Sequence, residues 1–410
     1  MKMKFKYKED FPTLEEYNIL LRKLKKISKE YFSLDEMINS NYTNDLMIKY
    51  ELEKRKIINK MFKEIISCFS ILNKISCAIY LNGSFARRSI TTNSDVDLTF
   101  YFNKKDIEKY QPLVLLFRNA IATMLNVSTM HVHSFTKNFT TEYRKENNLV
   151  IYDKDFNIEI IWPNNEKYII DYPSDQMAAE RETCEITSIK NIKLLEELYI
   201  NQMKKYHPKE WVYTHDLIYI NKKSFSIEKL ITKLDSIYTK IEIEKALLKI
   251  KNEVNDLLEE ITTYYKKLEK DEQIVLADFN MIGKRKVTMM FYAFMTYMRW
   301  YYIYNGRDDI SRNIDLVSFF NYNSGLINQD KLIDIYNDYN YFRFLISRVE
   351  IWTRKYNHHY EHRSREVVSK DVFYKEYKEL WLEPKEPLKE QIKIVLNLKQ
   401  NINRFLKTLE

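Results

Sequence analysis

The chain has 410 residues, a net charge of +8 and only four glycines, where average usage of about 7% would give roughly 29. No two glycines lie closer than 19 residues apart, so the sequence excludes the three-glycine turn of dinucleotide-binding folds and the two-glycine P-loop. The charge surplus is small for this length and is weak evidence for a nucleic-acid partner.

The cysteines and the apolar stretches indicate the cellular compartment of the protein. Three scattered cysteines show no paired spacing, so we expect neither a disulfide framework nor a structural zinc site. The first ten residues contain no apolar run of the kind found in signal peptides. The most apolar stretch, 289–298, is too short to cross a bilayer. We therefore expect a cytoplasmic protein with no membrane partner.

Hydrophobic periodicity predicts long helices at both ends of the chain and short strands between them. The expected helices are 13–29, 45–72, 106–125, 228–270, 284–304, 329–357 and 389–406. The expected strands are 77–81, 96–102, 130–135, 149–152 and 158–162. Asn44 precedes the second helix and is its expected N-cap.

These elements predict an α+β fold, in which a mixed β-sheet flanked by helices is followed by an all-helical domain. After Pro173 the pattern is helical almost throughout. We expect an N-terminal helical segment at 1–74, a mixed core at 75–172 and a helical C-terminal domain at 173–410.

Gly83 and Ser84 stand where the expected strand 77–81 gives way to a short helix. A glycine lets the backbone approach phosphates closely, and the amides of a helix N-terminus favour an anion. Arg87 and Arg88 add charges that reach phosphoryl oxygens. The sequence therefore predicts a phosphate-binding turn here.

Asp95 and Asp97 lie at the start of the second expected strand, after the polar loop 91–94. Residues two apart on a strand point to the same side, so the two carboxylates lie together. Neighbouring carboxylates repel unless a cation sits between them, and hard oxygen ligands select Mg²⁺ or Mn²⁺. The sequence therefore predicts a metal site.

The order of strand, Gly-Ser, loop and Asp-x-Asp resembles the DNA polymerase β-type nucleotidyltransferase superfamily, and Ser94 directly before the acidic pair strengthens the likeness. The resemblance implies a nucleotidyltransferase core at 75–172 and a third acidic residue on a later strand. Glu159 matches best, although the family usually has Asp there. Asp153 and Asp155 are rivals.

The resemblance implies phosphoryl transfer with two metal ions, Mg²⁺ or Mn²⁺. Asp95 and Asp97 would hold both ions, and Glu159 would complete the one nearest the attacking hydroxyl. Gly83, Ser84, Arg87, Arg88 and Ser94 would bind the nucleotide.

The run 83–98 looks most like the bacterial branch of PII uridylyltransferases and related enzymes with a helical substrate-binding domain. That likeness implies an NTP substrate, ATP or UTP, and a hydroxyl acceptor on a protein or small molecule. The PII enzymes carry further domains for hydrolysis and amino-acid sensing, for which we expect little room in this chain. The single His215-Asp216 dipeptide does not indicate a metal hydrolase, because such a site needs further His and Asp ligands.

Several alternatives stay open. Cyclic or linear oligonucleotide synthases of bacterial defence, antibiotic nucleotidyltransferases and tRNA-modifying toxins share this core. A nucleic-acid partner is possible on that basis but is not indicated by the residues. A further class is a non-catalytic helical interaction protein that only binds nucleotides.

Three features of the helical half allow two interpretations each. His358 and His362 have a spacing that can bind zinc, but a solvated basic cluster is more common. The aromatic run 291–302 could stack on bases, but aromatics on all sides of a helix indicate a core helix. Arg343 and Arg348 could face a triphosphate or lie on a solvated helix face.

Overall fold

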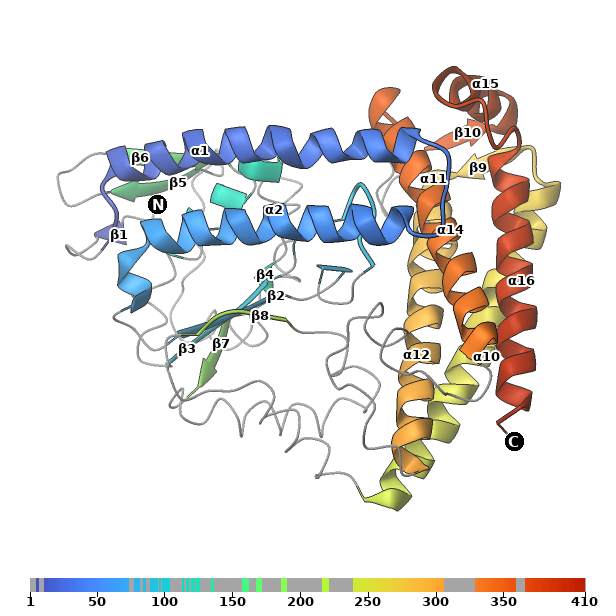
Figure 1. The fold of residues 1–410 in the computed structure, drawn as a ribbon. Helices are drawn as coiled ribbons and strands as arrows, with labels where there is room; N and C mark the ends of the chain where they lie inside the picture. The colour runs from blue at the N-terminus through green and yellow to red at the C-terminus, as the bar shows by residue number, and fades with distance from the viewer. Residues whose placement is uncertain are drawn as a thin grey trace.

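Figure 1 shows the computed structural model, in which long helices cross the top and one side of the molecule and the strands labelled β2, β3, β4, β7 and β8 lie below the upper helices. The described residues are 5–6, 11–73, 77–81, 84–85, 89–94, 96, 98–103, 113, 116–117, 119–121, 123–125, 134–135, 157–161, 167–171, 186–189, 216–220, 239–305, 329–358 and 366–409. The strand predicted at 149–152 lies outside them.

The chain opens with two long helices that lie side by side (Figure 1). They are α1 (Leu14–Ser33) and α2 (Leu46–Cys68), joined through the 3-10 helix η1 (Leu34–Asn39), and a further 3-10 turn, η2 (Ser70–Asn73), follows α2. A capping box between Thr13 and Glu16 starts α1 where the sequence predicts its beginning.

The predicted N-cap of α2 is wrong. Asp45, and not Asn44, is the N-cap residue, and its side chain makes no capping hydrogen bond. Thr43 Oγ1 donates to Asp45 Oδ1 at 2.7 Å, and Lys49 Nζ pairs with Asp45 Oδ2 at 2.5 Å. Because these two partners engage the carboxylate, it does not bind the amides of its own helix.

The central sheet has five strands in the order β4-β3-β2-β8, with β7 also paired to β3. The strands are β2 (Cys77–Leu81), β3 (Leu98–Asn103), β4 (Ser134–Phe135), β7 (Ile186–Ile189) and β8 (Asp216–Ile220). β2 runs antiparallel to β3 and β8, whereas β4 and β7 run parallel to β3. The predicted mixed sheet is therefore present.

Two of these strands correct the prediction that the chain is helical after residue 173. Both β7 and β8 hydrogen-bond into the sheet of the predicted core. Each is only four or five residues long and rich in isoleucine, so its period is too short to stand out from helical neighbours.

A separate three-stranded sheet has the order β1-β5-β6. Its strands are β1 (Phe5–Lys6), β5 (Asn157–Ile161) and β6 (Lys167–Asp171). β5 runs parallel to β1 and antiparallel to β6. The strand predicted at 158–162 is thus present, but it pairs outside the central sheet.

The C-terminal part is built on four long helices that pack along one another at one side of the molecule (Figure 1). They are α10 (Lys240–Lys270), α12 (Val287–Tyr304), α14 (Gln329–Lys355) and α16 (Pro387–Lys407). The sequence predicts all four, with shifts at their ends.

Smaller elements at one end of this bundle were not predicted. They are β9 (Gln273–Val275), α11 (Leu276–Asp278), the π-helix η6 (Phe279–Lys286), β10 (Val367–Ser369) and α15 (Lys370–Leu380). β9 and β10 pair antiparallel. The basic run at 284–286, predicted as the start of the helix 284–304, lies in this π-helix, which leads into α12.

The aromatic run of α12 belongs to the core, as its all-round distribution predicts. Phe291 and Phe294 are fully buried, and Tyr292 and Tyr297 are nearly so. The Phe291 ring stacks on the Tyr339 ring of α14 with centroids 3.8 Å apart. Among the described residues, no helix combines the length and apolar character that a bilayer crossing requires.

The contact of α1 with the helical residues between 113 and 125 is held by one buried hydroxyl. Tyr17 is fully buried, its OH donates to the Leu116 carbonyl at 2.8 Å, and Asn119 Nδ2 donates to it at 2.9 Å. We expect Tyr17→Phe to lower the free energy of unfolding by about 1–2 kcal/mol, because two buried groups lose a partner. Urea denaturation measures this change.

The matched control is Tyr374→Phe. Tyr374 is a half-buried tyrosine of α15 for which the described part of the chain shows no side-chain hydrogen bond. We expect its substitution to change the free energy of unfolding by less than about 0.5 kcal/mol. Equal losses in the two variants would show that the Tyr17 hydroxyl does not hold α1 in place.

Candidate active site

The ends of β2 and β3 meet at one edge of the central sheet. Leu81, the last residue of β2, pairs with Leu98, the first residue of β3. Because the strands are antiparallel, the segment that follows β2 and the segment that precedes β3 start from the same edge. Gly-Ser follows β2 and Asp-x-Asp precedes β3, so the topology connects both predicted motifs at this edge.

The predicted site residues divide between the described and the remaining parts of the chain. Ser84, Ser94 and Glu159 are on described residues, whereas Gly83, Arg87, Arg88, Asp95 and Asp97 lie outside them. The linking segment, which we define as residues 84–94, is described at 84–85 and at 89–94.

Ser84 lies in a helical turn at the start of the linking segment. Its carbonyl accepts the Ser89 backbone N–H at 2.9 Å and the Ser89 hydroxyl at 3.4 Å. Its own Oγ is buried and, within the described part of the chain, has no hydrogen-bond partner. A buried hydroxyl without a partner is unfavourable, so a ligand oxygen at this position would be stabilising.

Residues 91–94 form a closed turn, which we call the 91–94 turn. The Ser94 N–H donates to the Thr91 carbonyl at 3.2 Å, and the Thr91 N–H donates to Ser94 Oγ at 2.8 Å. Ser94 is buried. The Ser94 hydroxyl thus accepts a hydrogen bond within the turn, which ends one residue before Asp95. Its predicted contact with nucleotide stays a prediction.

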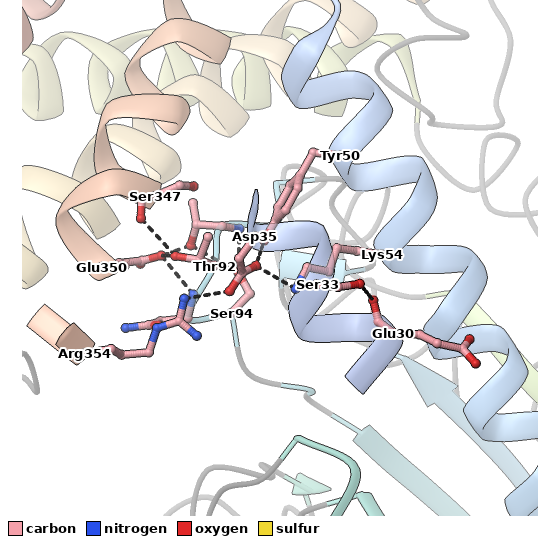
Figure 2. Close-up of polar contacts among 12 residues, drawn as sticks. Glu30, Ser33, Asp35, Tyr50, Lys54, Thr92, Ser94, Ser347, Glu350 and Arg354 are labelled. Atoms are coloured by element: carbon pink, nitrogen blue, oxygen red, sulfur yellow. Dashed lines mark hydrogen bonds and ion pairs between the residues drawn. The ribbon is translucent and has the colours of Figure 1, made fainter. Parts of the chain in front are cut away.

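Glu350 of α14 binds the 91–94 turn with both carboxylate oxygens (Figure 2). Its Oε1 accepts from Thr91 Oγ1 at 3.1 Å, and its Oε2 accepts from Thr92 Oγ1 at 3.0 Å and from the Asn93 N–H at 2.9 Å. Lys284 Nζ lies 2.6 Å from Oε1. Thr92 Oγ1 is also 3.0 Å from the Ser347 carbonyl.

Buried arginines contact two further described residues of the linking segment, Phe85 and Ile90. On α2, Arg55 donates to the Phe85 carbonyl, next to Ser84. On α14, Arg343 Nη2 donates to the Ile90 carbonyl at 2.8 Å and pairs with Glu51 of α2 at 2.6 Å. Helices from opposite ends of the chain therefore both contact the linking segment.

The electrostatics of Arg343 follow from its burial. Loss of water is the largest single effect and disfavours the charge of Arg343. Attraction to Glu51, together with the neighbouring tyrosines Tyr339, Tyr292 and Tyr336, outweighs it and leaves the pKa of Arg343 raised. Arg348 is buried as well and donates to the carbonyls of Ile38, Ser40 and Glu383. Both arginines therefore have structural partners, and neither lies on a solvated helix face.

The strand that carries Glu159 is not a neighbour of β3 among the described strands. β5 belongs to the β1-β5-β6 sheet, and its residue Glu159 pairs with Ile169 of β6. The structure therefore does not bring β5 into the sheet of Leu98. The role of Glu159 as third acid stays a prediction.

A different acidic residue lies at the edge where β2 ends. Asp216 is the first residue of β8 and pairs with Leu81 on the side opposite Leu98. In the sequence it is part of the His215-Asp216 dipeptide, where its position directly before the apolar run 217–220 was the available sign of this placement.

His358 has carboxylates at both ring nitrogens. Its Nδ1 lies 2.5 Å from Glu366 Oε1, its Nε2 lies 3.2 Å from Glu376 Oε2, and its ring packs on Trp352. Among the described residues, no three potential metal ligands gather into a site. His362, the other half of the predicted zinc pair, lies outside them.

The comparison with protein families identifies this same part of the chain. Residues 63–157 match the family described as "Polymerase beta, Nucleotidyltransferase". The match spans the end of α2, β2, the linking segment and β3. It supports a nucleotidyltransferase domain of the DNA polymerase β-type superfamily here. The specific PII-uridylyltransferase-like branch has no such support, and no curated protein matches the chain significantly.

A second polar cluster, around the buried Lys54, lies beside the contacts of Glu350 (Figure 2). Asp35 of η1 accepts from Tyr50 OH at 2.8 Å and pairs with Lys54 Nζ at 2.9 Å and with Arg354 Nη2 at 2.7 Å. Lys54 is fully buried, with its ammonium 3.4 Å from the Tyr31 ring centroid. Burial lowers the pKa of Lys54 to about 8, although Asp35 opposes the shift.

The lowered pKa of Lys54 predicts that the free energy of unfolding depends on pH. The unfolded chain keeps the Lys54 proton up to about pH 10.5, so between pH 8 and 10.5 it binds more protons than the folded chain. Stability from this residue therefore rises with pH. Between pH 7 and 9.5, we expect wild type to gain about 2 kcal/mol relative to Lys54→Met, at ~1.36 kcal/mol per pKa unit. Urea denaturation across this range tests it, and a constant difference would contradict it.

Proposed function

We propose that the protein is a metal-dependent nucleotidyltransferase that transfers a nucleoside monophosphate from an NTP to a hydroxyl acceptor and releases pyrophosphate. The observation that carries the proposal is the pairing of Leu81 with Leu98, which starts the Gly-Ser and Asp-x-Asp segments from one sheet edge. The family match across both segments supports it. ATP and UTP are the NTPs that the sequence favours.

The proposed residue roles follow from the charges and hydrogen-bonding groups of the residues. Gly83 and Ser84 suit the triphosphate, since the Ser84 hydroxyl is buried and has no hydrogen-bond partner among the described residues, and Arg87 and Arg88 would be the counter-charges. Asp95 and Asp97 are hard oxygen donors that suit two Mg²⁺ or Mn²⁺ ions. These ions would supply charge stabilisation at the phosphates.

The proposed transfer forms one bond to the α-phosphorus and breaks another. The acceptor hydroxyl oxygen forms a bond to the α-phosphorus, and the bond from that phosphorus to the oxygen bridging to the β-phosphate breaks. The hydroxyl proton goes to a carboxylate, and pyrophosphate leaves with the bonding electron pair. Among the described residues, two positions compete for the third carboxylate, namely Glu159 from the sequence pattern and Asp216 from its register beside Leu81. The rivals Asp153 and Asp155 lie outside the described residues.

The direct test is incubation with labelled ATP, UTP, CTP and GTP in the presence of Mg²⁺ or Mn²⁺. We expect wild type to release pyrophosphate with at least one nucleotide, and Asp95→Asn and Asp97→Asn to fall to the background rate, because the metal ligands lose their charge. The control is Asp330→Asn on exposed α14 surface, which should retain wild-type turnover.

Two results would contradict the assignment. Turnover that survives in the Asp95→Asn/Asp97→Asn double variant would remove these residues from the site. Absence of turnover with every nucleotide and acceptor pool would favour the non-catalytic binding protein. Glu159→Gln and Asp216→Asn, assayed side by side, identify the third acid as the one whose loss abolishes turnover.

The acceptor distinguishes the remaining alternatives. A labelled protein or small molecule supports the uridylyltransferase-like activity. A nucleotide dimer or trimer formed without added acceptor, identified by its mass, would instead support an oligonucleotide synthase. Labelled tRNA would support the toxin-type activity.

A further inference from the structure

Glu350 is a buried carboxylate whose partners come from far along the chain. Its side chain is 0% exposed, and it lies near the C-terminal end of α14. Three of its four donors belong to the 91–94 turn, more than 250 residues earlier, and the fourth is Lys284 of η6. The turn ends one residue before Asp95.

The chemistry of this site requires a carboxylate. Each oxygen faces two donors, since Oε1 accepts from Thr91 and Lys284 while Oε2 accepts from Thr92 and the Asn93 amide. An amide in place of the carboxylate would turn its NH₂ group toward one of these pairs. A threonine hydroxyl can rotate so that it accepts a hydrogen bond from this NH₂ group. The Lys284 ammonium and the Asn93 backbone N–H can only donate, so one of them would face the NH₂ group without an acceptor.

The charge balance also depends on the pair as a whole. A buried carboxylate is tolerated only when a cation and hydrogen-bond donors compensate it. Lys284 supplies that cation and is itself only 21% exposed in its side chain. Glu350 therefore has one stable arrangement, in which the turn and the π-helix are both held against α14.

We propose that Glu350 is a positioning residue for nucleotidyl transfer, which fixes the 91–94 turn so that the acidic pair after it is held in the geometry for metal binding. This inference rests on the proposed function. Lys284 holds Glu350 in turn, which makes the position of the acids depend on the packing of the helical bundle. A displacement of about 1 Å in such a group can cost roughly 100-fold in rate.

The test is Glu350→Gln in the full chain, assayed by pyrophosphate release over a Mg²⁺ titration. We expect kcat to fall at least about tenfold and half-saturation to need more Mg²⁺, with KM for the NTP changed less than about threefold, because the acids move rather than the phosphate-binding turn. Unchanged kcat and Mg²⁺ dependence in folded Glu350→Gln would overturn the proposal.

Asp35→Asn is the matched control. Asp35 is also a largely buried carboxylate, paired to α14 through Arg354, but the described contacts do not include the 91–94 turn. We expect this variant to unfold at lower denaturant concentration and to keep the wild-type Mg²⁺ dependence. An equal shift in Mg²⁺ dependence would mean that any loss of packing has this effect, and would overturn the proposal.

Thr92 gives a second route if Glu350→Gln does not fold. Thr92→Val removes the hydroxyl that binds Glu350 and the Ser347 carbonyl but keeps the shape of the side chain. We expect it to lower kcat and raise the Mg²⁺ requirement, and Thr92→Ser to restore most of both. Identical behaviour of the two variants would overturn the proposal.

Failure of this inference is distinguishable from failure of the proposed function. A wild type with no turnover on any nucleotide would overturn the proposed function and this inference with it. An active wild type whose Glu350→Gln variant is equally active at every Mg²⁺ concentration would overturn the inference alone.

Discussion

The arrangement around the 91–94 turn depends on one fully buried carboxylate. Glu350 must be compensated on both oxygens, and it finds its donors in the turn and in Lys284. A charge in this position tolerates few alternatives, because loss of any donor leaves another polar group unsatisfied. The turn is therefore held in one conformation directly before the acidic pair.

The same constraint recurs along the linking segment. Arg343 and Glu51 are buried together, and Arg343 also donates to the Ile90 carbonyl, while Arg55 donates to the Phe85 carbonyl. α2 and α14 thus both contact described residues of the linking segment and support the proposed site.

The features that could be predicted from the sequence are those that depend on residues close together in the chain. Helices such as α10 and α14 were predicted because their apolar period extends over many turns, and the Gly-Ser and Asp-x-Asp motifs because they are local. β7 and β8 were missed because four or five residues give too little period. Glu350 and Arg343 resemble surface charges in sequence, since only their tertiary partners show that they are buried.

Hydrogen exchange at the Asn93 amide tests the central claim, that Glu350 fixes the turn before the acidic pair. Asn93 is exposed as a residue, yet its N–H donates to Oε2 of the buried Glu350 at 2.9 Å. We predict slow exchange in wild type and Asp35→Asn, and fast exchange in Glu350→Gln. Exchange at the same rate in wild type and Glu350→Gln would contradict the account.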